Sequence, residues 1–429
     1  TVDVAVQELR LPNIAKALVA RYQAGVKVRV ILENNYSRPW SDLSATEINQ
    51  LDERDRDHYN EFIALVDTNQ DGQLSLQEIH QRDALVILHQ AGVALIDDTA
   101  DGSQGSGLMH HKFIIVDGNI LIVSSANFTT SDIHGDFKNL ETRGNANNLL
   151  KINSPQLAKL FTEEFNLMWG DGPRGEFDSK FGVKKTVRPA QTVTLGKTTV
   201  TVHFSPISSQ AAWQLSSNGL IGSTLNQATQ AVDLALFVFS DQTLANVLEN
   251  RHQKQVEIKA LIDPEFAFRD YSEGLDMLGV SIHNNCRTEA HNHPWQVPIT
   301  TVGIPQLAQG DKLHHKFGVV DKITVITGSH NWSAAANYDN DETVLVIKSS
   351  LIAAHYLREF NQLYRSAILG TSTQIQEKIQ ENKQGCPPLT SVSSTPVKNE
   401  LVNVNTANQQ ELESLPGIGT KLAQRIIEA

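Results

Sequence analysis

The sequence has few cysteines, no long apolar run and no excess of positive charge. Two cysteines, Cys286 and Cys386, among 429 residues cannot form a disulfide scaffold, and they do not make a Cys-x-x-Cys metal or redox motif. They could form one disulfide bridge or none. The longest apolar stretches, such as 235–239, have the length of a strand, whereas a membrane-spanning helix needs about 20 apolar residues. We therefore expect no membrane segment in this chain.

The net charge of −12 argues against a protein coated with a basic nucleic-acid-binding surface, so any anion should be bound locally. The acidity is concentrated in one segment. Residues 41–82 contain ten acidic residues and three arginines, a net charge of −7, which leaves −5 for the rest of the chain. This concentration indicates a separate acidic segment within an otherwise nearly balanced chain.

An internal repeat shows where the acidic segment comes from. Residues 26–32 recur at 256–262, and the Gly-Val pair at 92–93 recurs at 279–280 with a shorter offset, so the first copy carries about 43 extra residues. These extra residues are the acidic segment, which is therefore an insertion. Patterns typical of strands and helices occur in both copies. Strands are expected at 28–32, 113–116, 120–123, 234–239, 317–320 and 323–327, and helices at 12–24 and 241–251. The sequence thus predicts a duplicated α/β domain.

We predict six segments along the chain. They are a first copy at 1–170, an insertion at 41–85 within it, a connector at 171–199, a second copy at 200–370, a Pro-, Ser- and Thr-rich linker at 371–400 and a short module at 401–429. The second copy has about 30 residues before Val232, whereas the first copy has one residue before the matching Val2. We therefore expect that a preceding stretch is missing from this chain.

The pattern His-x-Lys-x4-Asp occurs once in each copy. The residues are His110, Lys112 and Asp117 in the first copy and His314, Lys316 and Asp321 in the second. On a strand, residues i and i+2 share a face, so each His and Lys point the same way while a regular strand turns the Asp to the other face. We expect the His and Lys pairs to form the site and both Asp residues to be structural.

Polar residues follow each pattern at similar spacing. The further candidates are Ser125, Asn127 and Glu141 in the first copy and Ser329, Asn331 and Glu342 in the second. One imidazole could attack phosphorus and the other protonate the leaving oxygen, while Lys and Asn side chains surround the phosphoryl oxygens and a carboxylate orients an imidazole. A buried His beside a Lys can be coincidence in one copy. Two copies with the same spacing favour a single shared active site.

These motifs resemble the phospholipase D superfamily, in which His-x-Lys-x4-Asp is followed by Gly-Ser-x-Asn. The resemblance covers residues 1–367 and implies two half-sites related by a pseudo-twofold axis, a covalent phosphohistidine and no catalytic metal. By this resemblance His110 is the nucleophile, His314 is the acid, and the Lys and Asn residues of both motifs bind phosphate. Ser124 replaces the usual Gly, which Gly328 retains in the second copy. Because one chain carries both half-sites, a monomer is sufficient.

The acidic insertion contains a loop at 67–78 that satisfies each position of the EF-hand pattern. Oxygen ligands fall at Asp67, Asn69, Asp71, Gln73, Ser75 and Glu78, and Gly72 permits the sharp turn. The flanks 59–66 and 76–85 read as helices. The resemblance to EF-hands implies Ca²⁺ bound for structure or regulation. The simpler alternative is an acidic, solvated loop between two helices, and EF-hands usually occur in pairs.

The C-terminal module reads as two short helices joined by Pro-Gly-Ile-Gly. It resembles the helix-hairpin-helix of competence-type DNA receptors, and backbone N–H groups at such a helix start bind phosphate. The candidate nucleic-acid-binding residues are Gly417, Ile418, Gly419 and Lys421. A helical hairpin used only for protein contact is the alternative. A second possible metal cluster, at His283, Cys286, His291 and His293, matches no standard zinc spacing, and a substrate-facing loop is favoured.

Together these features predict a phosphodiesterase that hydrolyses nucleic acid, as an endonuclease with DNA as its partner. One alternative is a phospholipase D or phosphatidyltransferase acting on phospholipid, which the same two half-sites would serve. Another is a non-catalytic DNA-binding protein, but this conflicts with the presence of both half-sites. The sequence does not distinguish DNA from RNA, or single from double strands.

Overall fold

The computed structural model describes residues 1–103, 107–136, 139, 141–282, 291–371, 375–377 and 379–380. The chain divides into two units, 1–382 and 383–429, and the second lies outside the described residues. The predicted helix-hairpin-helix with Gly417, Ile418, Gly419 and Lys421 therefore falls outside them, as do Cys286 and Cys386. Among the described residues, no helix is both long enough and apolar enough to cross a membrane.

The first copy forms a six-stranded sheet in the order β3-β2-β1-β4-β5-β6. Its strands are β1 (Val2–Val6), β2 (Val28–Leu32), β3 (Ala94–Asp97), β4 (Lys112–Val116), β5 (Ile120–Ser124) and β6 (Leu149–Asn153). The first three strands run parallel, as expected where helices connect them, and β4, β5 and β6 follow as antiparallel neighbours. The β4–β5 hairpin carries the first His and Lys.

The second copy forms a nine-stranded sheet in the order β17-β12-β11-β9-β13-β14-β16-β8-β7. Its strands are β7 (Gln191–Leu195), β8 (Thr198–Ser205), β9 (Ala231–Leu236), β11 (Glu257–Ile262), β12 (Val302–Ile304), β13 (Lys316–Val320), β14 (Thr324–Gly328), β16 (Glu342–Lys348) and β17 (Ile368–Leu369). The run from β12 to β16 repeats the order of the first sheet, which confirms the duplicated α/β fold. Strand β7 lies inside the predicted connector 171–199.

One strand prediction is wrong in its extent. The run 234–239 does not form one strand, because β9 ends at Leu236 and β10 (Phe239–Ser240) pairs with β15 (Trp332–Ser333) in a separate two-stranded sheet. Strands β3, β6, β7, β12, β16 and β17 were not predicted. In β6, exposed and half-buried residues alternate, so it lacks the continuous apolar run by which the buried strands were recognised.

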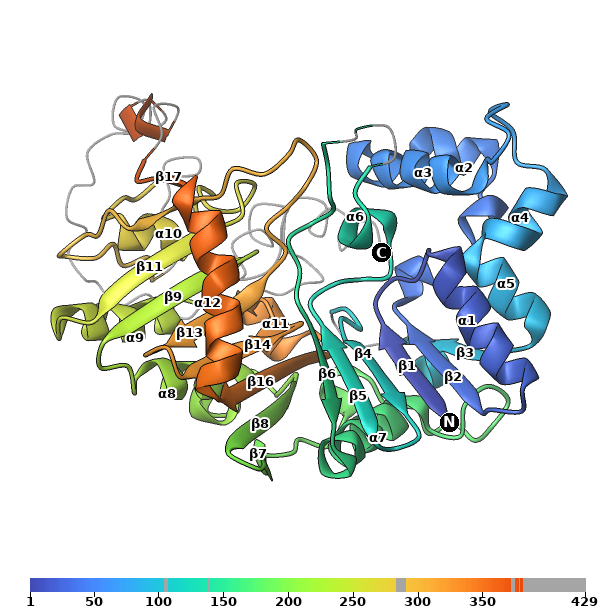
Figure 1. The fold of residues 1–429 in the computed structure, drawn as a ribbon, viewed down its shortest axis with the longest axis horizontal. Coiled ribbons are helices and arrows are strands. Elements are labelled where there is room, and N and C mark those ends of the chain that lie inside the picture. The colour runs from blue at the N-terminus through green and yellow to red at the C-terminus, as the bar shows by residue number, and fades with distance from the viewer. Residues whose placement is uncertain are drawn as a thin grey trace, which may run out of the picture. The chain divides into compact units, whose positions relative to one another are not determined.

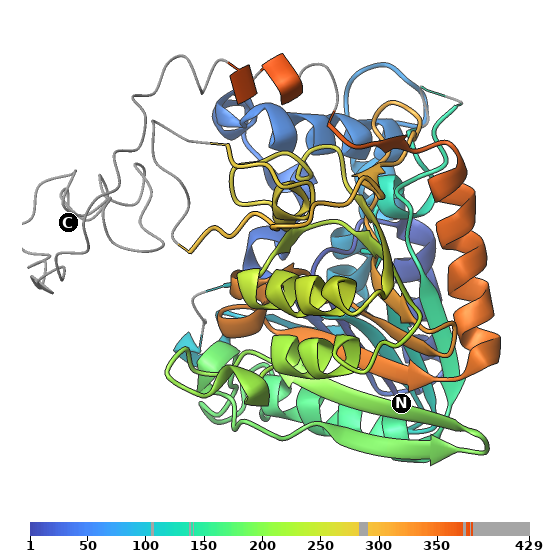
Figure 2. The same ribbon diagram turned by 90° about the vertical axis from the view of Figure 1, so that its left-hand side faces the viewer.

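Helices cover both sheets and also join the two copies. Helices α1 (Pro12–Gln23) and α5 (Ala84–Ala91) pack with the first sheet, and α8 (Ser217–Leu225), α9 (Gln242–Gln253) and α10 (Glu273–Met277) pack with the second. Helices α7 (Pro155–Trp169) and α12 (Ser350–Arg365) share one core with residues of both sheets. In Figures 1 and 2, α12 lies on the opposite side of the second sheet from α8 and α9.

That shared core holds the two halves together. Phe113 and Phe161 of the first copy and Phe317 and Phe360 of the second are buried in the same cluster. Phe113 meets Phe161 edge-on with ring centroids 5.1 Å apart, an arrangement that aromatic pairs favour. Because apolar residues of both copies are buried together, the two His-Lys pairs belong to one folded unit.

The insertion contains α2 (Ala45–Gln50), α3 (Glu53–Val66) and α4 (Leu76–Arg82), and α4 is followed directly by α5. The predicted helix at 76–85 is therefore wrong in extent, because Asp83 interrupts it and caps α5 by accepting hydrogen bonds from the backbone N–H of Leu85 and Val86. Trp40, Phe62 and Val66 form a small buried cluster within the insertion. Short α6 (Thr130–Ile133) and α11 (Ala334–Tyr338) follow the two Ser-x-Asn elements.

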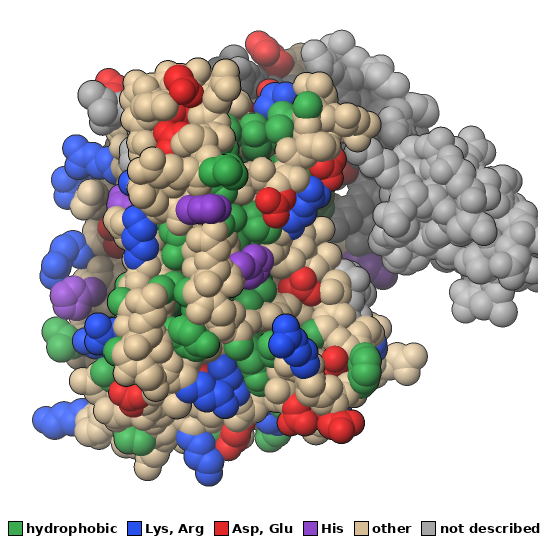
Figure 3. Space-filling model, turned by 90° about the vertical axis from the view of Figure 1, so that its right-hand side faces the viewer, with side chains coloured by type: hydrophobic (Ala, Val, Ile, Leu, Met, Phe, Trp, Pro, Cys, Tyr) green, Lys and Arg blue, Asp and Glu red, His purple; other side chains and the backbone are tan. Residues whose placement is uncertain are grey.

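Figure 3 shows the face of the molecule that lies at the right of Figure 1. Lys and Arg side chains are scattered there among Asp, Glu and apolar side chains, so the described residues of this face form no continuous basic strip. This agrees with the overall acidic charge of the chain. On this face, an anionic ligand would therefore need a local site.

Candidate active site

Both His-Lys pairs lie where a central strand of their sheet begins. His110 and Lys112 stand at the start of β4, and His314 and Lys316 at the start of β13. Each Lys donates a hydrogen bond from Nζ to the carbonyl oxygen of its own His, at 3.0 Å in the first copy and 2.8 Å in the second. The exposed fractions are 6% and 8% for the two His and 1% for each Lys, so all four groups are removed from bulk water.

The strands that carry the histidines are held by loops of the opposite copy. The backbone N–H of His110 donates to the carbonyl of Asp341 at 3.0 Å, and in the other copy the N–H of Ala146 donates to the carbonyl of Lys312 at 2.7 Å. His110, His314, Asn127 and Asn331 line one cavity of about 1060 Å³. The fold thus brings both half-sites together in a single site.

His110 is oriented by a carboxylate from the second copy. Its Nδ1 lies 2.8 Å from Oε2 of the fully buried Glu342, so Nδ1–H donates to the carboxylate and Nε2 is left to act on a ligand. Burial lowers the pKa of His110 well below its usual value, and the charges of Lys112 and Lys316 lower it further. Burial raises the pKa of Glu342, while the charges of His330 and Lys112 act against this.

His314 has a different partner. Its Nδ1 donates to Oδ1 of Asn147 at 3.0 Å, and Asp132 lies 3.5 Å away while holding the Asn147 amide at 3.1 Å. Burial again lowers the pKa of His314 well below its usual value, together with both lysine charges. The two imidazoles are therefore inequivalent, because only His110 makes a direct hydrogen bond to a carboxylate.

Glu141 does not orient an imidazole, contrary to the prediction, because Asn147 is the partner of His314. Glu141 is exposed in a turn, whereas strand pairing makes Asn147 the counterpart of Glu342, since Leu149 pairs with Ser124 in β5 as Val344 pairs with Gly328 in β14. The connection from Asn127 to the following strand is longer in the first copy. The similar Asn-x-Glu triplets, which end at Glu141 in the first copy and at Glu342 in the second, therefore lie at different positions of the fold.

The two lysines have different surroundings. Lys112 Nζ donates to Oε1 of Gln7 at 3.2 Å, whereas Lys316 Nζ lies 4.5 Å from the ring centroid of Phe237, which occupies the matching position of the second copy. Burial lowers the pKa of Lys112 to about 8, and burial together with the Lys112 charge lowers the pKa of Lys316. An anion bound between these lysines would relieve their mutual repulsion.

The predicted serines and asparagines divide into two groups. Ser125 donates to Oδ1 of Asn147 at 2.8 Å, and Ser329 accepts from the backbone N–H of Thr343 at 3.0 Å, so both buried hydroxyls hold the elements that orient the imidazoles. Asn127 and Asn331 instead line the cavity, and each has a buried amide oxygen without a protein partner in the described part of the chain. These two amides are placed to meet a ligand.

The two Asp residues of the motifs lie in the hairpin turns. Asp321 accepts hydrogen bonds from the backbone N–H groups of Gln230 and Ala231, and Asp117 accepts from the Thr1 nitrogen. Both have positive φ values, 52° for Asp117 and 51° for Asp321, so the strand has ended before them. Asp117 therefore holds the chain just before β1, and Asp321 holds the start of β9. Neither contact involves the cavity.

Sequence reasoning missed three residues of the site. Asp132 lies on α6, where the second copy has Ala336, so no repeat could reveal it. Asn147 belongs to the asparagine-rich run 145–148 just before β6, which was a usable signal. His111, the neighbour of His110, bonds through Nδ1 to Thr343 at 2.9 Å and through Nε2 to Glu164 at 3.1 Å, so it braces the two copies.

The sequence suggested two metal sites, one around His283, Cys286, His291 and His293 and one in the loop at 67–78. His293 donates its backbone N–H to Gln242 and lies 3.4 Å from Glu249, while His283 and Cys286 lie outside the described residues. In the part of the chain that the structure describes, no three side chains of His, Cys, Asp or Glu are gathered closely enough to hold a metal ion. The acidic side chains of the loop at 67–78 are likewise not gathered in this way.

Comparison with known proteins identifies the family. The sequence profile described as "Cardiolipin synthase, PLD-like domain" matches residues 1–169 and 221–364, which is more than half of the chain, and a helix-hairpin-helix profile matches 397–429. Mitochondrial cardiolipin hydrolase of Xenopus laevis is 27% identical over 158 residues, covering 36% of this chain and 64% of that protein. Phospholipase D of Rickettsia conorii is 26% identical over 147 residues, covering 34% and 62%. The chain thus spans less than two thirds of the length of these curated relatives.

Among solved structures, phosphatidylserine synthase of Haemophilus influenzae superposes with a TM-score of 0.51, at 11% sequence identity, over 89% of this chain and 87% of that one. At this identity the likeness shows the fold alone. The superposition extends over both copies, and the family profile also matches both copies. The chain therefore belongs to the phospholipase D-like family and carries a helix-hairpin-helix motif at its C-terminal end.

Proposed function

We propose that the chain is a phosphodiesterase that hydrolyses nucleic acid through a phosphohistidine on His110. Nε2 of His110 attacks phosphorus, a P–N bond forms, and the P–O bond to the leaving oxygen breaks as His314 donates a proton to that oxygen. His314 then takes a proton from water, whose oxygen attacks phosphorus and breaks the P–N bond. The carboxylate of Glu342 supports the first step, because it stabilises the positive charge that His110 gains.

The charge that develops on phosphorus is met by side chains of this chain. Lys112 and Lys316 supply two positive charges in a site removed from bulk water, where such charges act more strongly than in solvent. Asn127 and Asn331 can donate from their amides to the phosphoryl oxygens. The resemblance to the family implies no catalytic metal, and the steps above use none.

The nucleic-acid assignment rests on one observation, the helix-hairpin-helix motif at 397–429 in the same chain as the two half-sites. The lining of the cavity supports a hydrophilic substrate, because its apolar side chains are few, with Ala64, Leu108 and Phe237 among them. A lipid acyl chain would need a more apolar surface. The names of the relatives, cardiolipin hydrolase and phospholipase D, make phospholipid hydrolysis the second candidate.

The pH dependence follows from the histidines. Their lowered pKa values make both imidazoles neutral at pH 7 in the free site, so the protonated fraction of the acid His314 falls as the pH rises through its lowered pKa. We therefore expect kcat/KM to be bell-shaped with its maximum on the acid side of about 6.5. A bound phosphodiester anion favours the imidazolium, so the falling limb of kcat should lie at higher pH.

Rates on a short single-stranded oligonucleotide, whose alkoxide leaving group must be protonated, would measure both profiles from pH 4 to pH 10. A kcat/KM that rises steadily through pH 9 would contradict the assignment of an imidazolium acid. Because the two histidines lie in one site, the pKa values read from the limbs belong to the coupled pair rather than to either residue.

Deleting residues 401–429 tests the substrate class. The module should contribute mainly effective concentration, so we expect the KM for DNA to rise about tenfold or more, and kcat/KM for bis(p-nitrophenyl) phosphate to stay within about twofold. Single-stranded DNA, duplex DNA, RNA and cardiolipin vesicles would be compared in parallel with the full chain. Equal losses on DNA and on the small ester would place the module in the catalytic core, and turnover of cardiolipin without turnover of nucleic acid would establish the lipid alternative.

A further inference from the structure

The insertion forms one wall of the active-site cavity. Asp57, Glu61 and Ala64 of α3 line the same cavity as His110 and His314. The insertion is far from both motifs in sequence, and the motifs gave no reason to place it beside the site. In Figure 1, α3 lies next to α6, which carries Asp132. Any change in the position of α3 therefore changes the shape and charge of the space that a substrate must enter.

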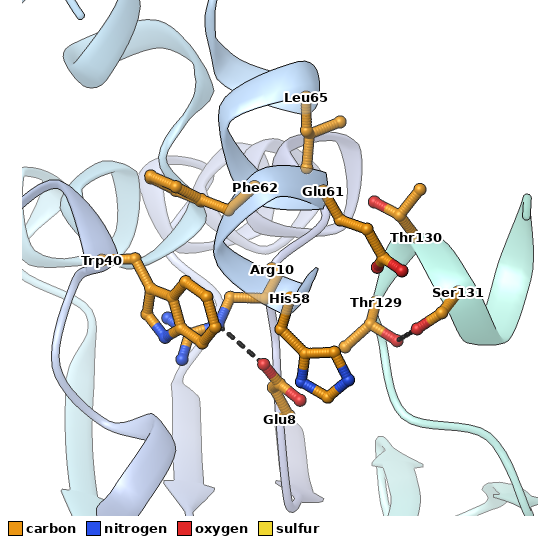
Figure 4. A pocket seen from close by; sticks show the side chains of 10 residues that line it. All are labelled: Glu8, Arg10, Trp40, His58, Glu61, Phe62, Leu65, Thr129, Thr130 and Ser131. Atoms are coloured by element: carbon orange, nitrogen blue, oxygen red, sulfur yellow. Dashed lines mark hydrogen bonds and ion pairs between the residues drawn. The ribbon is translucent and has the colours of Figure 1, made fainter. Parts of the chain in front are cut away.

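In the contact between α3 and the first copy, some buried polar atoms have no hydrogen-bond partner among the described residues. Figure 4 shows His58 and Glu61 of α3 facing Glu8 and Arg10 across a small pocket. Arg10 donates to Glu8 at 3.0 Å and its guanidinium lies 4.9 Å from the ring centroid of Trp40. Nη2 of Arg10 and Nδ1 of His58 are buried without a partner in the described chain. Because unpaired buried polar groups are costly, this contact can be separated more easily than an apolar core.

Helix α3 ends at the first ligand position of the loop at 67–78. Asp67 is only 8% exposed, its Oδ2 accepts from the backbone N–H of Gly72 at 3.0 Å, and its Oδ1 is buried with no partner among the described residues. A buried carboxylate oxygen that faces into its own loop requires a donor or a cation. The loop offers three carboxylates with amide, hydroxyl and carbonyl oxygens, which is the donor set that Ca²⁺ prefers.

Glu78 is the ligand that must move. Its Oε1 accepts from the backbone N–H of Thr68 at 2.8 Å, and its Oε2 accepts from the hydroxyl of Ser75 at 2.8 Å. To bind an ion together with Asp67 and Asp71, the Glu78 carboxylate must give up its hydrogen bonds from Thr68 and Ser75. It must then turn toward the carboxylates of the two Asp residues. Glu78 lies in the first turn of α4, so its movement pulls the start of α4 toward the end of α3.

The far end of α4 is anchored in the core of the first copy, whereas α3 is anchored mainly at its C-terminal end. Helix α5 follows α4 directly, and its Leu85 and Leu88 are buried in the core of the first copy. Asp83, between these helices, also accepts a hydrogen bond from Ser41 at 2.8 Å. Helix α3 is held at its C-terminal end by the small cluster around Phe62 and by two hydrogen bonds from Arg82 to the carbonyl of Leu65, and toward the cavity by the incompletely satisfied contact with Arg10. A change in the angle between α3 and α4 must therefore displace α3.

We propose that calcium binding in the loop at 67–78 moves α3 away from the active-site cavity and so admits anionic substrates. The wall that α3 and its N-cap present is acidic: Asp52, Glu53 and Asp57 line the cavity, together with Glu61, whose pKa burial raises to about 7, so that it is only partly charged at neutral pH. These carboxylates repel a polyanion and have little effect on a small monoanion. The movement of α3 does not depend on the function proposed above, but the choice of DNA as the polyanion rests on it.

The test compares the wild type with Glu78→Gln, which keeps the cap of α4 because glutamine serves in a capping box, and with Glu176→Gln, which removes an exposed carboxylate elsewhere. Three quantities are measured with and without Ca²⁺. They are calcium affinity by isothermal titration calorimetry, hydrogen exchange of 53–66, and KM for single-stranded DNA and for bis(p-nitrophenyl) phosphate. Circular dichroism first verifies that each variant is folded.

We expect wild type and Glu176→Gln to bind Ca²⁺, to change the exchange of 53–66, and to lower the KM for DNA by about fivefold or more, with the small ester unchanged within about twofold. Glu78→Gln should lose all three responses. Wild-type protein that binds no Ca²⁺, or binds it without any change at 53–66, would overturn the proposal. If no phosphodiester is turned over under any condition, the proposed function fails, while the binding and exchange data still decide whether calcium moves α3.

Discussion

Replacing His110 by alanine is expected to lower kcat by about 10⁵-fold, and replacing His314 by about 10³-fold or more, because one residue forms the covalent bond and the other transfers the proton. Both are needed in one site, since His110 and His314 line the same cavity. The double variant should be little worse than His110→Ala alone, because residues that act as a unit are not additive. Steady-state turnover of bis(p-nitrophenyl) phosphate measures all three.

His355→Ala is the matched control, since His355 lies exposed on α12 and should leave kcat within about twofold when it is removed. Near-normal activity in either His110→Ala or His314→Ala would show that each half works by itself. In that case the shared cavity would not be the catalytic unit.

The Glu342→Gln substitution is expected to lower kcat by about 10² to 10⁴-fold while the fold is kept. The amide oxygen of glutamine could still accept the 2.8 Å hydrogen bond from Nδ1, but the neutral amide no longer stabilises the positive charge that His110 gains when it attacks phosphorus. Stability should not fall, because burial already disfavours the charged form of Glu342 and a neutral amide of the same shape avoids that cost. Kinetics and thermal melting of the same sample separate the two effects.

Glu141→Gln is the control for that experiment. Glu141 and Glu342 follow matching motifs in the sequence, but the structure leaves Glu141 exposed in a turn. We expect Glu141→Gln to keep kcat within about twofold of the wild type. Comparable losses in Glu141→Gln and Glu342→Gln would contradict the pairing of Glu342 with His110 and would restore the equivalence suggested by the motifs.

The sequence allowed the duplicated fold and the two His-Lys pairs to be predicted for a physical reason. Buried central strands such as β4 and β13 are continuous apolar runs, and the His and Lys stand at fixed positions at their starts. These features are local, so a single sequence reveals them. The matching order of the two sheets then follows from the repeat.

The partners of the histidines could not be predicted in the same way. Asn147 and Asp132 reach His314 only through the longer connection of the first copy, and the repeat gives no counterpart for Asp132. The position of α3 against the cavity depends on how Trp40 and Arg10 pack, which no periodicity encodes. Contacts between loops of different copies are set by tertiary packing, so they appear only in the folded structure.

The most direct test of the shared site is the covalent intermediate. With bis(p-nitrophenyl) phosphate the leaving p-nitrophenolate needs little protonation, so His314→Ala should still form the adduct but should hydrolyse it slowly for lack of a base. Rapid acid-free quenching and mass spectrometry of peptides would then find the p-nitrophenyl phosphoryl group on His110, with one p-nitrophenolate released per enzyme. An adduct on a residue other than His110, or a complete turnover with no adduct on any histidine, would contradict the account.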